Sequence, residues 1–426
     1  MGYLYQFGIG LYMLFMRIAA LFSAKADLWV RGRKNWRQQM AGAAYDDASV
    51  RNNIRTIWFH CASLGEFEQG RPVLEAFRER NPDWRILLTF FSPSGYEYRK
   101  HYEHAYHVCY LPMDSLPNVR KFLDIWNPEI AVFVKYEFWF NYLRELAARR
   151  VKLFVISAVF RKKQHFFRFY GYWFRKQLRH VTRFFVQDEA SRHLLANYGI
   201  TNVKVSGDTR FDRVYALAQE EHAIPGIETF VRGNKILVAG STWPKDERLL
   251  KGLLKSMPQN LRVIVAPHEV SDDKINRLMQ QAGPSACLYS SFSDAENDGC
   301  RVMIIDRIGL LSRLYRYGDI AYIGGGFGEG IHNILEAATY GIPVVFGPNH
   351  GKFVEARELI SGGGAFCIRD QQELNDLFLL LMNDESMRKK AGSVCKEYVE
   401  KKQGAVKMIM QDLGEASMKN TGPSSK

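Results

Sequence analysis

Short apolar runs rich in β-branched residues alternate, from residue 54 onwards, with longer stretches whose apolar residues recur at helical spacing. The strands that this pattern predicts in the first half are 54–60, 85–91, 130–134, 152–157 and 183–187. Helices are predicted between them at 70–80, 118–124 and 138–149. Strands and helices that alternate at this length are typical of a parallel sheet covered by helices on both faces.

The alternation weakens over residues 214–233, which we predict to be a linker, and then starts again. Strands of the second half are predicted at 235–239, 262–266, 302–305, 319–323 and 343–346. The sequence therefore predicts an α/β fold with two Rossmann-like domains, 25–215 and 216–415, that face each other across a cleft. Such open sheets bind ligands at the carboxyl ends of their strands. The polar residues 416–426 are predicted to be a disordered tail.

The N-terminal stretch, residues 2–23, is apolar apart from Gln6, Arg17 and a few small or aromatic polar groups. About 20 such residues can span a bilayer as a helix. Basic residues follow, which predicts that the downstream domains are cytoplasmic; they are Lys25, Arg31, Arg33 and Lys34. We therefore predict a membrane-anchoring helix over residues 1–24. Arg17 leaves open a helix that lies in the interface without crossing it.

Composition agrees with two globular domains and adds a preference for anionic partners. The chain has 426 residues, of which 47% are hydrophobic and 24% charged. Its formal net charge of +13 favours a nucleotide, a phospholipid or a phosphorylated glycolipid as partner. Charge alone also leaves nucleic acid possible.

The cysteines and histidines give little sign of a metal site. The six cysteines are scattered without a CxxC pair, which argues against a zinc cage or a disulfide framework and favours a reducing compartment. His101, His104 and His107 follow an HxxHxxH spacing, but no acidic or thiolate residue completes a ligand set. We interpret these histidines as a polar surface.

A glycine-rich turn at residues 324–330 is the strongest local signal. It follows a predicted strand, and an amphipathic helix is predicted to begin near His332. Glycines let a ligand approach the backbone, and a helix N-terminus offers N–H groups to phosphate. Asn333 and Glu336 would point toward the same pocket, where a carboxylate can accept ribose hydroxyls. Alternatively, Glu336 only complements the helix dipole; a second glycine turn at 347–351 favours the nucleotide.

Three more loops follow predicted strands in the second half, at 240–244, 266–269 and 306–309. Helix capping explains each of them separately. Because all three lie at strand ends, together they indicate a ligand site at that edge of the sheet.

Charged residues also follow the predicted strands of the first half. Glu66 comes after strand 54–60 and could take a proton from an attacking hydroxyl, although position alone favours a carboxylate that merely complements the helix dipole. Lys135 and Glu137 lie among aromatic residues at the end of strand 130–134. Arg210 could stabilise a departing phosphate. The alternative for Arg210 is a surface ion pair with Asp208 or Asp212.

Residues 160–183 contain no acidic residue and interleave lysine and arginine with phenylalanine, tyrosine and tryptophan. This composition suits an anionic membrane surface or a phosphorylated lipid. Stacking on nucleic-acid bases is the alternative.

Seven motifs in this order resemble the 3-deoxy-D-manno-octulosonic acid (Kdo) transferases of lipopolysaccharide biosynthesis. They are LWVRGRK (28–34), HCASLGE (60–66), YEFW (136–139), SGDTRFD (206–212), GSTW (240–243), GGGFGEGIHNILEA (324–337) and GPNHGKF (347–353). The resemblance implies a GT-B fold, CMP-Kdo as donor, a lipid A precursor of the lipid IVA type as acceptor, and inversion without a metal or other cofactor. It also implies the cytoplasmic face of a bacterial inner membrane and no nucleic-acid partner.

The resemblance assigns the general base to Glu66 and transition-state stabilisation to Arg210. The CMP contacts that it implies are Pro267, His268, Ile308, Gly309, Leu310, Asn333, Ile334, Leu335 and Glu336. The chain departs from the family in three places. Many members have glutamate at Lys135, for which Glu137 could partly substitute; His268 stands for an arginine, and Leu310 for an acidic residue.

Two other functions stay open from the sequence. A related GT-B enzyme could use a UDP-sugar, as a transferase or an epimerase. A non-enzymatic adaptor could bind the membrane surface through segment 160–183 alone, but it would have no use for the glycine turns.

Overall fold

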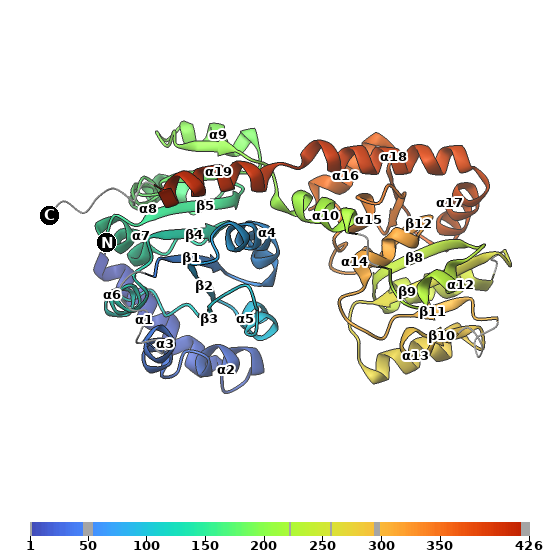
Figure 1. Cartoon of the computed structure of the whole chain (residues 1–426), viewed down its shortest axis with the longest axis horizontal. Helices are drawn as coiled ribbons and strands as arrows, with labels where there is room; N and C mark the ends of the chain where they lie inside the picture. The colour runs from blue at the N-terminus through green and yellow to red at the C-terminus, as the bar shows by residue number, and fades with distance from the viewer. Residues whose placement is uncertain (1, 46–53, 221–222, 256–257, 294–298, 419–426) are drawn as a thin grey trace. The chain divides into compact units, whose positions relative to one another are not determined.

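The computed structural model describes residues 2–45, 54–220, 223–255, 258–293 and 299–418. The chain folds into two compact units (Figure 1). The first unit comprises residues 1–212 together with 403–426, and the second comprises 213–402.

The first unit is built on a seven-stranded sheet with the order β3-β2-β1-β4-β5-β6-β7, in which every pair of neighbours is parallel. Its strands are β1 (Thr56–Cys61), β2 (Arg85–Phe90), β3 (His107–Tyr110), β4 (Ile130–Val134), β5 (Lys152–Ala158), β6 (Arg183–Val186) and β7 (Val203–Val205). Its longer helices are α1 (Gly2–Ala19), α2 (Ala24–Arg31), α3 (Trp36–Tyr45), α4 (Leu64–Arg80), α5 (Pro93–Arg99), α6 (Leu116–Trp126), α7 (Phe140–Ala148), α8 (Tyr172–Leu178), α9 (Glu189–Ala196), α10 (Thr209–Gln219, continuing into the second unit) and α19 (Ala405–Met418).

Strand β1 shows why this sheet is covered on both faces. All six of its residues are buried, and successive side chains enter opposite cores because side chains alternate along a strand. Trp58 packs in the core that α6 and α7 cover, through residues such as Phe122. Phe59 packs in the opposite core, which α4 and α19 cover (Figure 1).

The C-terminal helix α19 belongs to the first unit, whereas the sequence-based division carried the second domain to residue 415. Both carboxylate oxygens of Asp212 accept hydrogen bonds from the backbone at its start, the shortest of them 2.9 Å from Gly404 N. Near its end, Asp412 pairs with Arg183 at 3.1 Å and with Lys204 at 2.5 Å. Of the predicted tail, residues 416–418 end this helix and residues 419–426 lie outside the described residues.

The second unit has its own seven-stranded parallel sheet, with the order β10-β11-β9-β8-β12-β13-β14. Its strands are β8 (Lys235–Thr242), β9 (Leu261–Pro267), β10 (Ala286–Leu288), β11 (Val302–Ile304), β12 (Ile320–Ile323), β13 (Val344–Phe346) and β14 (Ala365–Cys367). Its helices are α11 (Ile227–Val231), α12 (Pro244–Lys255), α13 (Asp272–Ala282), α14 (Leu311–Leu314), α15 (Leu335–Ala338), α16 (Val354–Gly362), α17 (Gln371–Asn383) and α18 (Glu385–Lys402). In the predicted linker, 214–233, α10 occupies residues up to Gln219 and α11 occupies Ile227–Val231, and the two units divide just before it, between Asp212 and Arg213.

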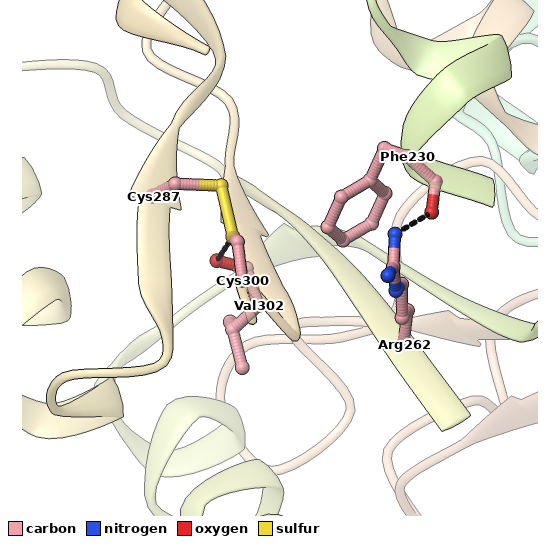
Figure 2. Close-up of a disulfide and its surroundings, with 5 residues drawn as sticks. All are labelled: Phe230, Arg262, Cys287, Cys300 and Val302. Carbon is pink, nitrogen blue, oxygen red and sulfur yellow. Dashed lines mark hydrogen bonds between the residues drawn. A yellow bond between two sulfur atoms is a disulfide. The ribbon is translucent and has the colours of Figure 1, made fainter. Parts of the chain in front are cut away.

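A disulfide corrects the prediction from the cysteine spacing. Cys287 and Cys300 are joined, with their Cα atoms 6.0 Å apart (Figure 2). The bond forms because β10 runs beside β11, with Ala286 opposite Val302, and this pairing brings the two cysteines together from 13 residues apart. The other four cysteines are free. Sequence spacing without a CxxC motif did not reveal a contact that depends on the sheet.

One side of helix α1 packs against the rest of the first unit. The Tyr5 hydroxyl donates a hydrogen bond of 2.6 Å to the buried Asp114, and the Tyr12 ring meets Trp29 edge-on. The opposite side presents large exposed apolar side chains: Leu4, Phe7, Leu11, Leu14, Phe15 and Ile18. The described part of the chain contains no helix with both the length and the apolar character needed to cross a bilayer.

Candidate functional site

Glu66 lies in the first turn of α4, directly after β1, and polar groups hold its carboxylate on both sides. The hydroxyl of Ser63, the N-cap residue of α4, donates a hydrogen bond to Glu66 Oε2. Lys135 Nζ lies 3.9 Å from Glu66 Oε1. The Glu66 side chain keeps 20% of its surface exposed. A carboxylate that is fixed in this way and still accessible can accept a proton from a bound hydroxyl.

Lys135 reaches Glu66 because β4 is the neighbour of β1 in the sheet. It directly follows β4 and has φ of +64°, a left-handed conformation that costs free energy in a residue with a side chain. Its N–H donates to Ile156 O at 2.9 Å, which holds the turn against β5. Strain of this kind at a strand end is common where a side chain is positioned for function.

Glu137 accepts a hydrogen bond from Trp139 and faces a ring nitrogen of His60. Its Oε2 lies 2.8 Å from Trp139 Nε1 and 3.4 Å from His60 Nε2. His60 is fully buried in β1, and its Nδ1 lies 2.8 Å from Thr89 Oγ1. His60 could not be singled out from the sequence, because a histidine inside a buried strand gives no local signal.

Arg210 forms an ion pair with Asp208, one of the two partners considered from the sequence. Its Nη2 lies 2.7 Å from Asp208 Oδ2, and Asp208 is only 6% exposed. Gln69, one turn after Glu66 on α4, donates to both Asp208 oxygens at 3.3 Å. Helix α4 therefore carries both Glu66 and Gln69, the residue that binds Asp208 of the Asp208–Arg210 pair.

In the second unit, the glycines of the 324–330 turn pack against protein backbone. A Cβ on Gly324 would lie 2.2 Å from Ser241 O, and one on Gly326 would lie 2.5 Å from Gly347 N in the other glycine turn. This close packing explains these two glycines without a ligand. The predicted helix begins at Leu335, three residues later than expected, and α15 is four residues long.

Asn333 and Glu336 do meet at the start of α15. Asn333 Nδ2 donates to Glu336 Oε1 at 3.0 Å, and Asn333 Oδ1 accepts from Leu335 N at 3.2 Å. Burial raises the pKa of Glu336, while the Asn333 hydrogen bond and the charge of Arg213 act in the opposite direction. The side chains of Ile334 and Leu335 are buried in the core, so only their backbone is available to a ligand.

His268 and His332 form a stack of rings with Trp243 at the same edge. The His268 ring lies 4.7 Å from Trp243 and 4.4 Å from His332, measured between centroids. Trp243 and His332 are nearly coplanar, at 7°, and Trp243 Nε1 lies 2.9 Å from His332 Nε2. Burial and the neighbouring His268 lower the pKa of His332 to about 4.

Asp246 ties this stack to the glycine turn. Its carboxylate is 1% exposed and accepts from Trp243 N, from Gly325 N, both at 2.9 Å, and from Tyr322 Oη at 2.7 Å. Helix capping was the explanation predicted for this loop, and neither Asp246 nor the ring contacts of Trp243 were predicted. The spacing of three residues from Trp243 to Asp246 was the available signal.

The remaining predicted CMP contacts also follow strands of the second sheet. Pro267 ends β9, next to His268. Ile308 is 85% exposed, Gly309 has φ of +92°, and Leu310 caps α14. Among the residues that the structure describes, no group of three or more His, Cys, Asp or Glu side chains is arranged to hold a metal ion.

Comparisons with known proteins point to one family. A family model described as 3-deoxy-D-manno-octulosonic-acid transferase matches residues 34–213. The chain is 26% identical over 353 residues to the 3-deoxy-D-manno-octulosonic acid transferase of Rickettsia felis, covering 79% of this chain and 73% of that protein. It is 28% identical over 338 residues to the enzyme of the same name from Aquifex aeolicus, covering 76% and 86%.

A solved structure supports the fold. UDP-GlcNAc 2-epimerase from Neisseria meningitidis, bound to UDP-GlcNAc, superposes with a TM-score of 0.57 at 16% identity, covering 86% of this chain and all of that one. At this identity the likeness shows two Rossmann-like domains, as in GT-B enzymes, and nothing about the ligand. The family model, which covers residues 34–213, and the sequence relatives together make the chain similar to the Kdo transferases, which are glycosyltransferases.

Proposed function

We propose that this protein transfers Kdo from CMP-Kdo to a lipid A precursor of the lipid IVA type, with inversion at the anomeric carbon and without a metal or other cofactor. The reaction belongs to lipopolysaccharide biosynthesis and takes place at the cytoplasmic face of a bacterial inner membrane. Similarity to the Kdo transferases supports the donor and acceptor.

The observation that carries the proposal is the placement of Glu66. Its carboxylate follows a buried central strand and is held by Ser63 and Lys135, yet part of it is open to a ligand. Glu66 would remove the proton from an acceptor hydroxyl while that oxygen attacks the anomeric carbon. Arg210, oriented by the buried Asp208, would stabilise the negative charge that develops on the departing CMP. Glu137 lies with His60 and Trp139 and would help to orient the acceptor.

The second unit would hold the nucleotide. His268 would contact CMP with its side chain, together with Pro267, Ile308, Gly309 and Leu310. At the start of α15, Asn333 and Glu336 would bind the ribose with their side chains. Ile334 and Leu335 would contribute only their backbone there.

Membrane association is supported by α1 and by segment 160–183. The exposed apolar side of α1 can be buried among acyl chains while Tyr5 and Tyr12 keep the opposite side on the protein. Phe169, 94% exposed, and Tyr172 add aromatic groups in a segment rich in lysine and arginine. A helix attached in this way would lie in the interface of an anionic bilayer.

The test is incubation of the purified full-length protein with CMP-Kdo and lipid IVA, followed by mass analysis of the lipid. We expect a product heavier by one or more Kdo residues, and release of CMP. The competing UDP-sugar function is tested in parallel by thermal shift with CMP and UDP. Stabilisation by UDP alone, with no change in lipid mass, would reject the proposal.

A further inference from the structure

The ring of His332 accepts a hydrogen bond from the indole N–H of Trp243, a group that can act only as a donor. An indole N–H has no acceptor function, so the 2.9 Å contact from Trp243 Nε1 requires an unprotonated Nε2 on His332. A neutral imidazole that accepts at Nε2 carries its proton on Nδ1. Nδ1 is the ring nitrogen that Trp243 does not contact.

The surroundings of His332 oppose a positive charge on its ring. His268 stacks on His332, and Lys274 lies 5.8 Å from the ring of Trp243. Burial and Lys274 in turn lower the pKa of His268. The carboxylate of Asp246, which binds Trp243, is already occupied by three donors: Trp243 N, Gly325 N and the Tyr322 hydroxyl.

Several contacts also fix the position of Trp243. Its backbone N–H is bound by Asp246, and its ring stacks on His268. Across the glycine turn, His332 N donates to Gly324 O at 3.3 Å, and a Cβ on Gly325 would come within 3.1 Å of the His332 ring. The donor and the acceptor of the Trp243–His332 bond are therefore both held by backbone contacts.

We infer that Trp243 is a positioning residue that holds His332 as a neutral imidazole with its proton on Nδ1, so that His332 offers the sugar nucleotide a hydrogen-bond donor without a positive charge. This inference rests on the proposed binding of CMP-Kdo to the second unit. A neutral donor can bind a phosphate or carboxylate oxygen of the donor sugar nucleotide. Unlike a cation, it does not hold the CMP product strongly after transfer.

The test uses full-length protein labelled with ¹⁵N-histidine, with the His332 signals assigned by comparison with His332→Gln. Long-range ¹H–¹⁵N spectra report which ring nitrogen carries the proton. The wild type should show His332 neutral from pH 6 to pH 8, with the proton on Nδ1, and its signals should move when CMP is added. Trp243→Phe keeps a stacking ring and removes the N–H. In this variant we expect a mixture of tautomers, a higher pKa for His332, and CMP binding weaker by about 5-fold, the value of one neutral hydrogen bond.

Trp36→Phe, which removes a tryptophan N–H from the first unit, is the matched control and should leave the His332 signals unchanged. A wild-type His332 with its proton on Nε2, or a Trp243→Phe spectrum identical to the wild type, would overturn the inference. CMP that binds without shifting the His332 signals would overturn the ligand role. Failure of CMP to bind at all would instead contradict the proposed function. In that case the position of the proton on His332 would still test the role of Trp243.

Discussion

Lys135 Nζ lies 3.9 Å from Glu66 Oε1, so a cation and a carboxylate from two neighbouring strand ends share one edge of the first sheet. Lys135 lies near Oε1 of Glu66, and the Ser63 hydroxyl donates a hydrogen bond to Oε2. The pair accounts for the left-handed backbone of Lys135, because that turn brings its side chain to Glu66.

Replacement of this lysine should slow transfer without weakening nucleotide binding. We expect Lys135→Met to lower kcat by about 10-fold, because Glu66 loses one of the two groups that orient it. Steady-state kinetics with CMP-Kdo and lipid IVA measure the change. Lys100→Met, which removes a lysine paired with Glu97 on the surface of the same unit, is the control. A kcat equal to that of the wild type would show that Lys135 has no part in positioning Glu66.

The disulfide in the second unit should contribute measurably to stability. A disulfide that closes a loop of 13 residues raises the free energy of unfolding by about 3 kcal/mol, because it restricts the unfolded chain. We therefore expect the double variant Cys287→Ser/Cys300→Ser to unfold at lower denaturant concentration than the wild type, and reductant to destabilise only the wild type. Cys367→Ser, at a free cysteine of the same unit, should behave like the wild type. If the wild type and the double variant were equally stable, with and without reductant, the Cys287–Cys300 disulfide would not contribute to stability.

Asp114 predicts a specific pH dependence of stability in the first unit. Burial raises its pKa to about 7, although hydrogen bonds from Tyr5, Asn141 N and Tyr142 N oppose the rise. An acid whose pKa is raised on folding binds its proton more tightly in the folded state, so the unfolding free energy falls as pH rises from about 4 to about 7. The loss is at most about 4 kcal/mol, the equivalent of three pKa units.

The variant Asp114→Asn cannot titrate and should flatten this dependence in urea unfolding between pH 5 and pH 8. Asp124→Asn, at an aspartate on the surface of α6, should keep the dependence of the wild type. If Asp114→Asn and the wild type lose stability in parallel over this range, Asp114 is not the group responsible.

The exposed side of α1 should determine binding to vesicles. The double variant Leu11→Glu/Phe15→Glu places two carboxylates on that side, and we expect it to lose flotation with vesicles that contain anionic lipid. Leu379→Glu/Leu380→Glu, at exposed leucines of α17, introduces the same charges elsewhere and should float like the wild type. Unchanged flotation of the α1 variant would exclude this face as the membrane contact.

Most of the architecture could be predicted from the sequence because the central strands are continuous buried apolar runs. The strand predicted at 130–134 agrees with β4 residue for residue. The missed strands are short pieces of three or four residues: β3, β7, β10 and β14. All four lie at the edges of their sheets and are only partly buried, whereas the equally short inner strands β11 and β13, which were predicted, are fully buried.

In the candidate site, too, some features follow from local sequence and others depend on long-range contacts. The positions of Glu66 and His268 after strands follow from local sequence, because parallel strands bring their carboxyl ends to one edge. The partners that hold these side chains could not be predicted. Contacts such as Lys135 with Glu66, or Trp243 with His332, join segments about 70 and 90 residues apart and depend on the order of strands in the sheet.

The central claim, that Glu66 is the base of Kdo transfer, is tested most directly by the transfer rate of Glu66→Gln. This variant keeps the shape of the side chain and removes its basicity, whereas Glu79→Gln alters an exposed glutamate on the same helix. We expect Glu66→Gln to bind CMP like the wild type and to transfer Kdo to lipid IVA slower by about 10²- to 10⁴-fold, and Glu79→Gln to remain fully active. A Glu66→Gln protein that transfers Kdo at the wild-type rate would contradict the account.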